Sequence, residues 1–211
     1  MPSRSIILDL DGTLADTEPL HDRAWDTVLT GIPREAIAEE RRKWVGMSSS
    51  EIARELIAAF HLSMSVEDML REKRKSFRDM VEKGLDPFPG LTEELANWTD
   101  AELAVATSGS RREALLVLEK LRLPVQWKAV VTCDDVPRAK PAPDCYLRAA
   151  ELLGKSPDQC IAIEDSINGM RAAVAAGTRV LAVSSSDLGS LPAGVERTFP
   201  STVGALEWLR R

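Results

Sequence analysis

Short apolar runs and longer amphipathic segments alternate along most of this chain. The first apolar run is Ile6–Leu8, which is followed by polar residues and a glycine. Downstream, apolar runs typical of buried strands alternate with segments of helical spacing. The predicted strands are Leu103–Ala106, Ala129–Thr132, Cys160–Ile163 and Arg179–Val183, and the predicted helices are Thr92–Trp98, Arg111–Leu121, Pro143–Leu153, Ile167–Ala176 and Val203–Leu209. This alternation predicts an α/β fold with a doubly wound parallel sheet.

A segment with helical patterning and no convincing strand separates the first strand from the others. Ser50 is expected to cap one of its helices. Turn-forming residues on both sides of the segment predict linkers. We therefore expect residues 1–14 and 87–211 to form a core, and residues 15–86 to form an inserted helical cap. Such a cap could close over the carboxyl ends of the strands and exclude water.

Composition narrows the classes of partner. The chain has 211 residues and a formal net charge of −6, and neither the cap segment nor the remainder has the basic excess that nucleic acid binding requires. Apolar runs stay well short of the ~20 residues that span a bilayer. The cysteines, Cys133, Cys145 and Cys160, are widely spaced, which favours reduced thiols in a cytoplasm. We expect a cytoplasmic protein, a monomer, with a small-molecule partner.

Two carboxylates follow the first predicted strand. Asp9 and Asp11 stand at its C-terminal end, where open parallel sheets bind ligands. Alternate residues of a strand share one side, so both acids can face one reacting centre. Their charges repel unless a cation lies between them. The tetrapeptide Asp-Leu-Asp-Gly could equally be a plain turn.

Two further stretches carry groups suited to phosphate. Thr107, Ser108 and Gly109 follow a predicted strand and precede a helix, so a hydroxyl and backbone N–H groups could cradle a phosphate there. The alternative is a simple helix cap at Ser110, and both can hold together. Lys140 lies in Lys-Pro-x-Pro, where the prolines restrict the backbone. It could neutralise a phosphoryl group, or be an exposed loop lysine.

A second acidic pair, Glu164 and Asp165, ends another predicted strand. Acids at a helix start can simply cap it. Paired carboxylates also supply the hard oxygen ligands that a small dication prefers. Together with Asp9 and the main-chain carbonyl of Asp11 they would form part of an octahedral Mg²⁺ site. We favour the cation because all of these acids meet at one sheet edge.

The string Asp-x-Asp-Gly-Thr-Leu-x-Asp directly after an apolar strand resembles the first motif of the haloacid dehalogenase superfamily, in its phosphatase and phosphomutase branch. The other stretches follow in the superfamily's order. The resemblance implies that Asp9 is the nucleophile that forms an aspartyl-phosphate, and that Asp11 is the general acid and base. It implies that Thr107, Ser108 and Lys140 hold the phosphoryl group. A dehalogenase is disfavoured, because that branch needs neither the second aspartate nor a metal.

The same resemblance assigns Mg²⁺ to Asp165, assisted by Glu164. The stretch from Asp16 to Trp25 resembles the hinge and first cap helix of the β-phosphoglucomutase-like subgroup, which includes sugar-phosphate phosphatases. Glu18 and His21 are therefore candidates for the substrate side of the cap, while Trp25 is better explained as cap core. Lys75 could approach the substrate or be an exposed helix lysine.

One departure favours a phosphatase over a mutase. The mutase carries an arginine after Gly-Val-Ser that grips the second phosphate of a bisphosphate, whereas this chain has Gly46-Met47-Ser48-Ser49. We expect a Mg²⁺-dependent phosphatase that acts on a small phosphomonoester, a sugar or polyol phosphate. The alternatives are a β-phosphoglucomutase-type phosphomutase and a catalytically idle binding module.

Overall fold

The protein consists of two compact units. The computed structural model describes residues 4–42, 44, 47–185 and 189–211. An α/β unit comprises Met1–Thr17 and Leu85–Arg211, and a helical unit comprises Glu18–Gly84. The chain thus leaves the α/β unit after Thr17, later than the predicted residue 14, and returns at Leu85, earlier than the predicted residue 87. Thr17 consequently belongs with the α/β unit.

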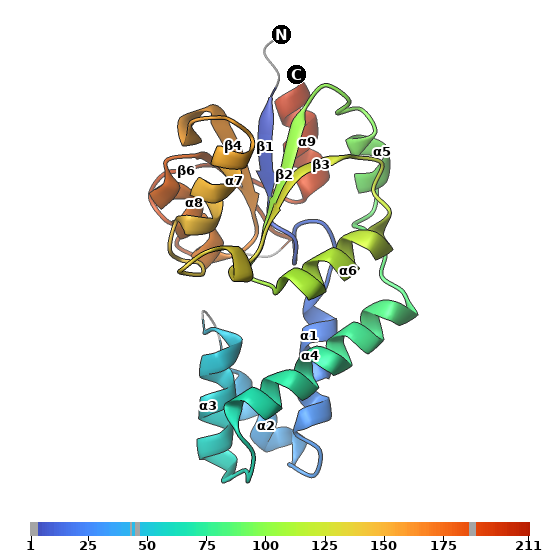
Figure 1. The fold of residues 1–211 in the computed structure, drawn as a ribbon, viewed down its shortest axis with the longest axis vertical. Coiled ribbons are helices and arrows are strands. Elements are labelled where there is room, and N and C mark those ends of the chain that lie inside the picture. Colours follow the sequence, from blue (N-terminus) through green and yellow to red (C-terminus); the bar gives the residue numbers. More distant parts are fainter. Residues whose placement is uncertain (1–3, 43, 45–46, 186–188) are drawn as a thin grey trace. The chain divides into compact units, whose positions relative to one another are not determined.

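A parallel sheet forms the centre of the α/β unit (Figure 1). Its strand order is β3-β2-β1-β4-β5-β6, and every neighbouring pair is parallel. The strands are β1 (Ser5–Leu8), β2 (Glu102–Ala106), β3 (Trp127–Val131), β4 (Cys160–Glu164), β5 (Arg179–Val183) and β6 (Val195–Phe199). The predicted doubly wound α/β fold is confirmed. Because the strands are parallel, their carboxyl ends share one edge of the sheet.

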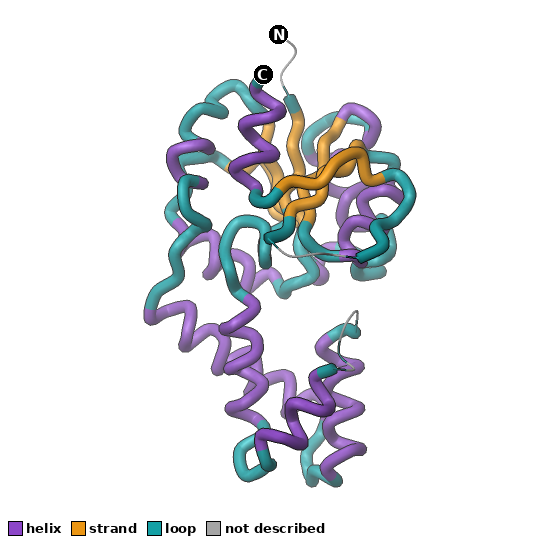
Figure 2. Tube along the Cα trace, turned by 180° about the vertical axis from the view of Figure 1, so that it is seen from behind, coloured by secondary structure: helices purple, strands orange, loops and turns teal. Residues whose placement is uncertain are grey.

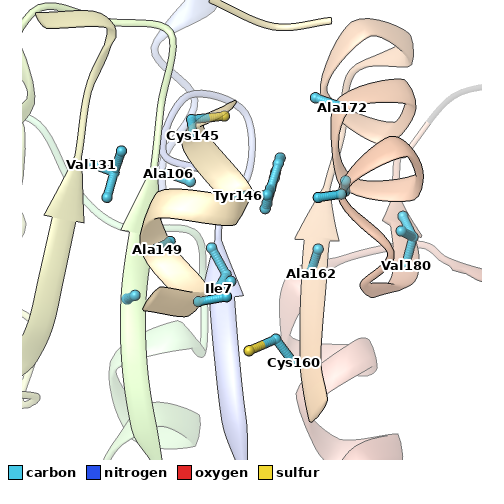
Figure 3. Packing of buried hydrophobic residues seen from close by; sticks show 14 of the residues in the cluster. Ile7, Ala106, Val131, Cys145, Tyr146, Ala149, Cys160, Ala162, Ala172 and Val180 are labelled. Atoms are coloured by element: carbon cyan, nitrogen blue, oxygen red, sulfur yellow. The ribbon is translucent and has the colours of Figure 1, made fainter. Parts of the chain in front are cut away.

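Helices cover both faces of this sheet, as the view from behind also shows (Figure 2). The helices of the unit are α5 (Leu91–Leu95), α6 (Arg111–Leu121), α7 (Asp144–Leu152), α8 (Ile167–Ala176) and α9 (Thr202–Arg210), with 3-10 turns η1 (Cys133–Asp135) and η2 (Pro157–Gln159). Helices α7 and α8 pack on one face through Tyr146, Ala149 and Ala172, against Ile7 and Ala162 of the strands (Figure 3). Alternate strand residues point to the other face.

Strand β6 is absent from the sequence prediction. Its residues, Val-Glu-Arg-Thr-Phe, are half-buried or exposed, because the strand lies at the edge of the sheet. The guanidinium of Arg179 pairs with Glu196 across β5 and β6 at 2.9 Å. Edge strands need no apolar run, so the apolar-run criterion passes over them.

The helical unit contains α1 (Glu18–Val28), α2 (Arg34–Arg41), α3 (Ser49–Phe60) and α4 (Val66–Lys83). It has its own apolar core, in which Trp25, Leu56 and Met69 are buried. The predicted cap of α3 is wrong by two positions. Ser48, not Ser50, accepts the hydrogen bond from the Glu51 amide, and Glu51 reaches back to the Ser48 amide to complete a capping box.

The described residues include no helix with the length and apolarity to cross a membrane. Each of the three cysteines is a free thiol, and Cys145 and Cys160 are buried.

Candidate active site

The turn after β1 places the first pair of acids at the carboxyl edge of the sheet. Asp9 still belongs to the strand ladder, since its amide donates to the carbonyl of Ile163 at 3.0 Å. The chain then turns at Gly12, whose φ of 75° is accessible to glycine at low cost. A Cβ atom at Gly12 would lie 1.9 Å from Asp165 Oδ2. The glycine therefore lets the first motif pack directly against the second acidic pair.

Lys140 is buried among oxygen atoms at this edge. Only 4% of its side chain is exposed, and its Nζ donates to Asp9 Oδ1 at 2.5 Å, to the Ala106 carbonyl at 2.9 Å and to Glu164 Oε1. The Arg138 guanidinium donates two hydrogen bonds to the carboxylate of Asp144, which follows the two prolines. The alternative of an exposed loop lysine is therefore wrong.

Glu164 is completely buried at the end of β4. Its Oε2 accepts hydrogen bonds from the amides of Asp165 and Ser166 and from Ser166 Oγ, each at 3.1 Å. Its Oε1 accepts from Tyr146 Oη at 2.7 Å as well as from Lys140. A Cβ at Gly169 would lie 1.8 Å from this carboxylate, so α8 approaches it through backbone alone. The Glu164 side chain is thereby held in one orientation.

Asp11 and the loop after β2 are joined by hydroxyl groups. Thr17 Oγ1 donates to Asp11 Oδ1 at 2.7 Å, and Thr107 Oγ1 donates to Asp11 Oδ2 at 3.4 Å. Thr107 Oγ1 also accepts the amide of Gly109 at 2.9 Å, while Ser108 is exposed. Ser110 caps α6, so the cap and the small-residue loop hold together, as the sequence allows.

Three of the predicted acids could hold a metal ion. Asp9, Glu164 and Asp165 each offer a carboxylate oxygen, and these atoms lie within 4.8 Å of one another. The donors are hard oxygens, which suit Mg²⁺. With Asp11 nearby, several carboxylates face the single ammonium group of Lys140, so a dication fits the charge as well as the donor set. The Asp11 carboxylate itself is engaged with Thr17 and Thr107.

Burial and mutual repulsion govern the ionisation of these acids. Desolvation raises the pKa of Asp9 well above its usual value, against the opposing charge of Lys140. Desolvation, together with the charge of Glu164, raises the pKa of Asp165 to about 8. Burial alone would lower the pKa of Lys140, but the charges of Asp9 and Glu164 raise it. A dication bound among the acids would favour their charged forms.

The candidate residues of the helical unit have different environments. Glu18 begins α1 and is exposed, and Lys75 on α4 is also exposed. His21 is stacked on the ring of Phe77 at a centroid distance of 4.1 Å. Trp25 is 4% exposed within the apolar core of the unit, in accord with a core role. Gly46 of the stretch compared with the mutase lies outside the described residues.

Sequence reasoning missed three residues that the structure brings into these contacts. Tyr146 reaches Glu164 from α7, Thr17 reaches Asp11, and Lys73 Nζ lies 2.9 Å from His21 Nδ1. Lys73 could have been found from its spacing, because it stands four residues after Met69 and four before Phe77, both buried on α4. Tyr146 and Thr17 carry no comparable signal.

The fold and this edge define an α/β protein with a buried acidic centre next to a fixed ammonium group. The chain belongs to the haloacid dehalogenase-like hydrolase family, whose model matches residues 6–183. The predicted superfamily is confirmed.

Its relatives include named phosphatases. The chain is 34% identical to fructose-1-phosphate phosphatase YqaB of Escherichia coli K12 over 173 residues, which are 82% of this chain and 92% of that protein. It is 32% identical to hexitol phosphatase A of the same organism, over 87% of this chain and 84% of that protein.

Solved structures agree in fold. CbbY from Rhodobacter sphaeroides in complex with phosphate superposes with a TM-score of 0.77 at 26% identity, over 95% of both chains. A hydrolase from Pseudomonas syringae gives 0.78 at 28% identity, over 99% of this chain and 98% of that one.

Proposed function

We propose that this chain is a Mg²⁺-dependent phosphatase that hydrolyses a small phosphomonoester, a sugar or polyol phosphate, through an aspartyl-phosphate intermediate. The observation that carries the proposal is the Lys140 ammonium group, buried between Asp9 and Glu164 at the strand ends. A cation fixed beside a carboxylate nucleophile is suited to neutralise a phosphoryl group. The names of the fructose-1-phosphate and hexitol phosphatases support the substrate class.

The two aspartates of the first motif would carry the chemistry. A carboxylate oxygen of Asp9 attacks phosphorus, and the bond from phosphorus to the ester oxygen breaks. Asp11 gives its proton to the leaving oxygen and then takes a proton from the water that attacks the aspartyl-phosphate. Inorganic phosphate leaves and Asp9 is regenerated. The hydrogen bond from Thr17 supports this role, because it orients Asp11 without donating a formal charge.

The remaining core residues would bind and position. Thr107, Ser108 and Gly109 would hold phosphoryl oxygens through hydroxyl and amide groups, together with Lys140.

A Mg²⁺ ion would be held by oxygens of the acidic centre. The proposed ligands are the carboxylates of Asp9, Glu164 and Asp165 and the main-chain carbonyl of Asp11. When bound, the ion supplies positive charge that stabilises the transferred phosphoryl group.

The helical unit would act as a cap that selects the substrate. We propose Glu18 and His21 as residues on its substrate side, with Lys75 as a further candidate on α4. The contact with Lys73 holds the His21 imidazole in place. A side chain held in place is better suited to recognise a substrate than an exposed one, which supports His21 as a candidate. A fold hosts many activities, so the substrate depends on these residues.

We also propose that the enzyme is a cytoplasmic monomer. Its free thiols suit a reducing compartment. Light scattering of the purified chain measures the oligomeric state directly.

A phosphomutase is the second candidate, and its support is the 28% identity with β-phosphoglucomutase of Bacillus subtilis. The mutase arginine would fall on Ser49, the first residue of α3. Without that guanidinium a bisphosphate intermediate lacks a bidentate partner for its second phosphate. This difference favours the phosphatase.

The deciding experiment measures phosphate release from hexose, pentose, polyol and glycolate phosphates, with Mg²⁺ and with EDTA. β-Glucose 1-phosphate with a bisphosphate primer is assayed in parallel for isomerisation. The expected result is Mg²⁺-dependent release from one or two sugar or polyol phosphates. Isomerisation without release would establish the mutase. Absence of any turnover would leave a binding module and overturn the proposal.

A further inference from the structure

Tyr146, the only tyrosine of the sequence, is completely buried on α7. Its ring lies in an apolar cluster with Ile7 and Ala162 of the strands and Ala172 of α8 (Figure 3). A buried hydroxyl without a partner is costly. The Tyr146 hydroxyl has such a partner, because it donates a hydrogen bond to Glu164 Oε1 at 2.7 Å. The phenol thus reaches a candidate metal ligand from the apolar side of the site.

The donors of Lys140 are fully used in the same network. A lysine ammonium has three N–H bonds. In Lys140 these are directed to Asp9 Oδ1, Glu164 Oε1 and the Ala106 carbonyl, which are three acceptors. A phosphoryl oxygen that binds Lys140 must therefore replace one of these acceptors.

Glu164 is the acceptor that can be replaced at the lowest cost. Its Oε1 retains the Tyr146 hydroxyl when Lys140 withdraws, and its Oε2 retains the donors of the Asp165–Ser166 turn. Without the phenol, withdrawal of Lys140 would strip Oε1 of both donors found here, and an unsatisfied buried charge is expensive. The Tyr146 hydroxyl therefore becomes the remaining donor to Glu164 Oε1 only when Lys140 moves away.

We propose that Tyr146 is the positioning residue that keeps the Glu164 carboxylate in its metal-ligating orientation while Lys140 exchanges that carboxylate for the phosphoryl group of the substrate. The proposal rests on the proposed function, because it assumes Mg²⁺ and a phosphate ester at this edge. Gly169 completes the arrangement, since a Cβ atom there would lie 1.8 Å from the Glu164 carboxylate, which the phenol reaches from the neighbouring helix α7.

The test is Tyr146→Phe, which removes one oxygen atom and keeps the ring. Mg²⁺ binding is measured by titration calorimetry with and without inorganic phosphate, and activity is measured as a function of Mg²⁺. With phosphate present, loss of this hydrogen bond to a metal ligand is expected to weaken Mg²⁺ binding by about tenfold, and without phosphate the loss should be smaller because Lys140 still contacts Glu164. The Mg²⁺ concentration for half-maximal activity should rise by a similar factor, while kcat at saturating Mg²⁺ stays within about twofold. With phosphate present, a Mg²⁺ affinity equal to that of the unchanged protein would overturn the proposal.

Ala149→Gly is the matched control, because Ala149 is a buried residue of the same helix and cluster. It should lower the melting temperature and leave the Mg²⁺ affinity unchanged. If it weakens Mg²⁺ binding as much as Tyr146→Phe does, the packing of α7 rather than the hydroxyl is responsible, and the proposal fails.

¹⁹F NMR tests the proposal in the protein that keeps its tyrosine. Because the chain has a single tyrosine, 3-fluorotyrosine labelling gives one ¹⁹F resonance. This resonance should shift when Mg²⁺ is added, and again when inorganic phosphate is added. A resonance insensitive to both contradicts the proposal. If the unchanged protein fails to bind Mg²⁺ in calorimetry, the proposed function falls as well, whereas equal binding by both proteins with phosphate present overturns only the role of Tyr146.

Discussion

The α/β unit and the helical unit each contain a buried lysine, in contrasting surroundings. The ammonium group of Lys140 lies between the carboxylates of Asp9 and Glu164. Lys73 is 5% exposed, its Nζ lies 2.9 Å from His21 Nδ1, and it stands 5.6 Å from the ring centroids of Trp25 and Phe77. One lysine is held among opposite charges, and the other borders an imidazole and two ring faces.

The two ammonium groups differ in the atoms that they contact. Lys73 Nζ lies within hydrogen-bonding distance of a ring nitrogen of His21, and an ammonium group can only donate. The Lys140 ammonium group instead contacts carboxyl oxygens of Asp9 and Glu164. Opposite charges at a sheet edge suit a site that handles a phosphoryl group, whereas rings and an imidazole suit a surface that recognises a neutral part of a ligand.

The largest effect is expected from Asp9→Asn, which removes the proposed nucleophile from the charged site. Turnover should fall by at least about 10⁴-fold, because removal of a covalent nucleophile abolishes the reaction it carries. Phosphate release is the measurement, and an unchanged circular dichroism spectrum is the control for folding. Near-normal turnover would end the assignment of Asp9 and with it the contrast between the two units.

Lys140→Met tests whether the first lysine is held by charge. The variant leaves Asp9 and Glu164 buried without their cation, and breaking such a pair typically costs about 3–5 kcal/mol of unfolding free energy. Activity should fall by about 10²–10³-fold. Urea unfolding in EDTA and phosphate release measure the two effects. A loss of stability below about 1 kcal/mol would show that the pair is screened as a surface pair is.

The contrast also explains which parts of the site could be predicted. Asp9, Glu164 and Asp165 follow or end apolar strands, and the parallel topology brings strand ends together. The meeting of these acids is a consequence of the sheet, so the sequence pattern suffices for them, while Lys140 lies in a loop that prolines restrict. Tyr146 lies on the apolar face of α7, so the sequence pattern predicts a core residue at this position. The pattern carries no information on the direction in which its hydroxyl points.

In the helical unit, prediction depends on the phase of a helix. Lys75 is two residues from Lys73, which on a helix of 3.6 residues per turn places it on the opposite side. Lys75, the residue that the sequence suggested, is exposed, whereas Lys73 is buried. A shift of two positions also separates the predicted cap Ser50 from the observed cap Ser48.

Lys73→Met and Lys75→Met form a matched pair in the helical unit. Lys73→Met removes the donor to His21, and kcat/KM should fall by about tenfold if that imidazole faces the substrate, since small misplacements are costly. Its free energy of unfolding should fall by about 2 kcal/mol, because a cation–ring contact of a buried, desolvated ammonium group is worth about that much. Lys75→Met should lower kcat/KM by less than Lys73→Met does, because Lys75 is exposed and the contact with His21 is made by Lys73.

The same assays and urea unfolding compare both variants with Lys140→Met. If Lys75→Met shows the larger loss of activity, Lys75 is the substrate-side lysine and Lys73 is structural. If Lys73→Met destabilises as much as Lys140→Met, the two buried lysines are held by interactions of equal strength and the contrast disappears.

The smallest effect is expected from Ser48→Ala at the start of α3. Loss of the capping box should cost about 1 kcal/mol, which corresponds to about fivefold faster hydrogen exchange of the Glu51 amide at neutral pH. Ser50→Ala, which removes the cap that the sequence pattern suggested, is the control and should leave that exchange unchanged.

The pH dependence of amide protection at the start of α3 tests the same capping box. Hydrogen bonds from Ser48, first from its side chain and then from its backbone, lower the pKa of Glu51 below 4.5. A lowered folded-state pKa contributes stability that is present above 4.5 and is lost as the pH falls through the lower value. Protection of the first turn of α3 should therefore decline in acid in the unchanged protein. In Ser48→Ala this decline should be smaller, because the side-chain bond, the larger of the two causes of the lowered pKa, is missing while the backbone bond remains. An equal decline in both proteins would mean that Glu51 is stabilised by the helix dipole rather than by the capping box.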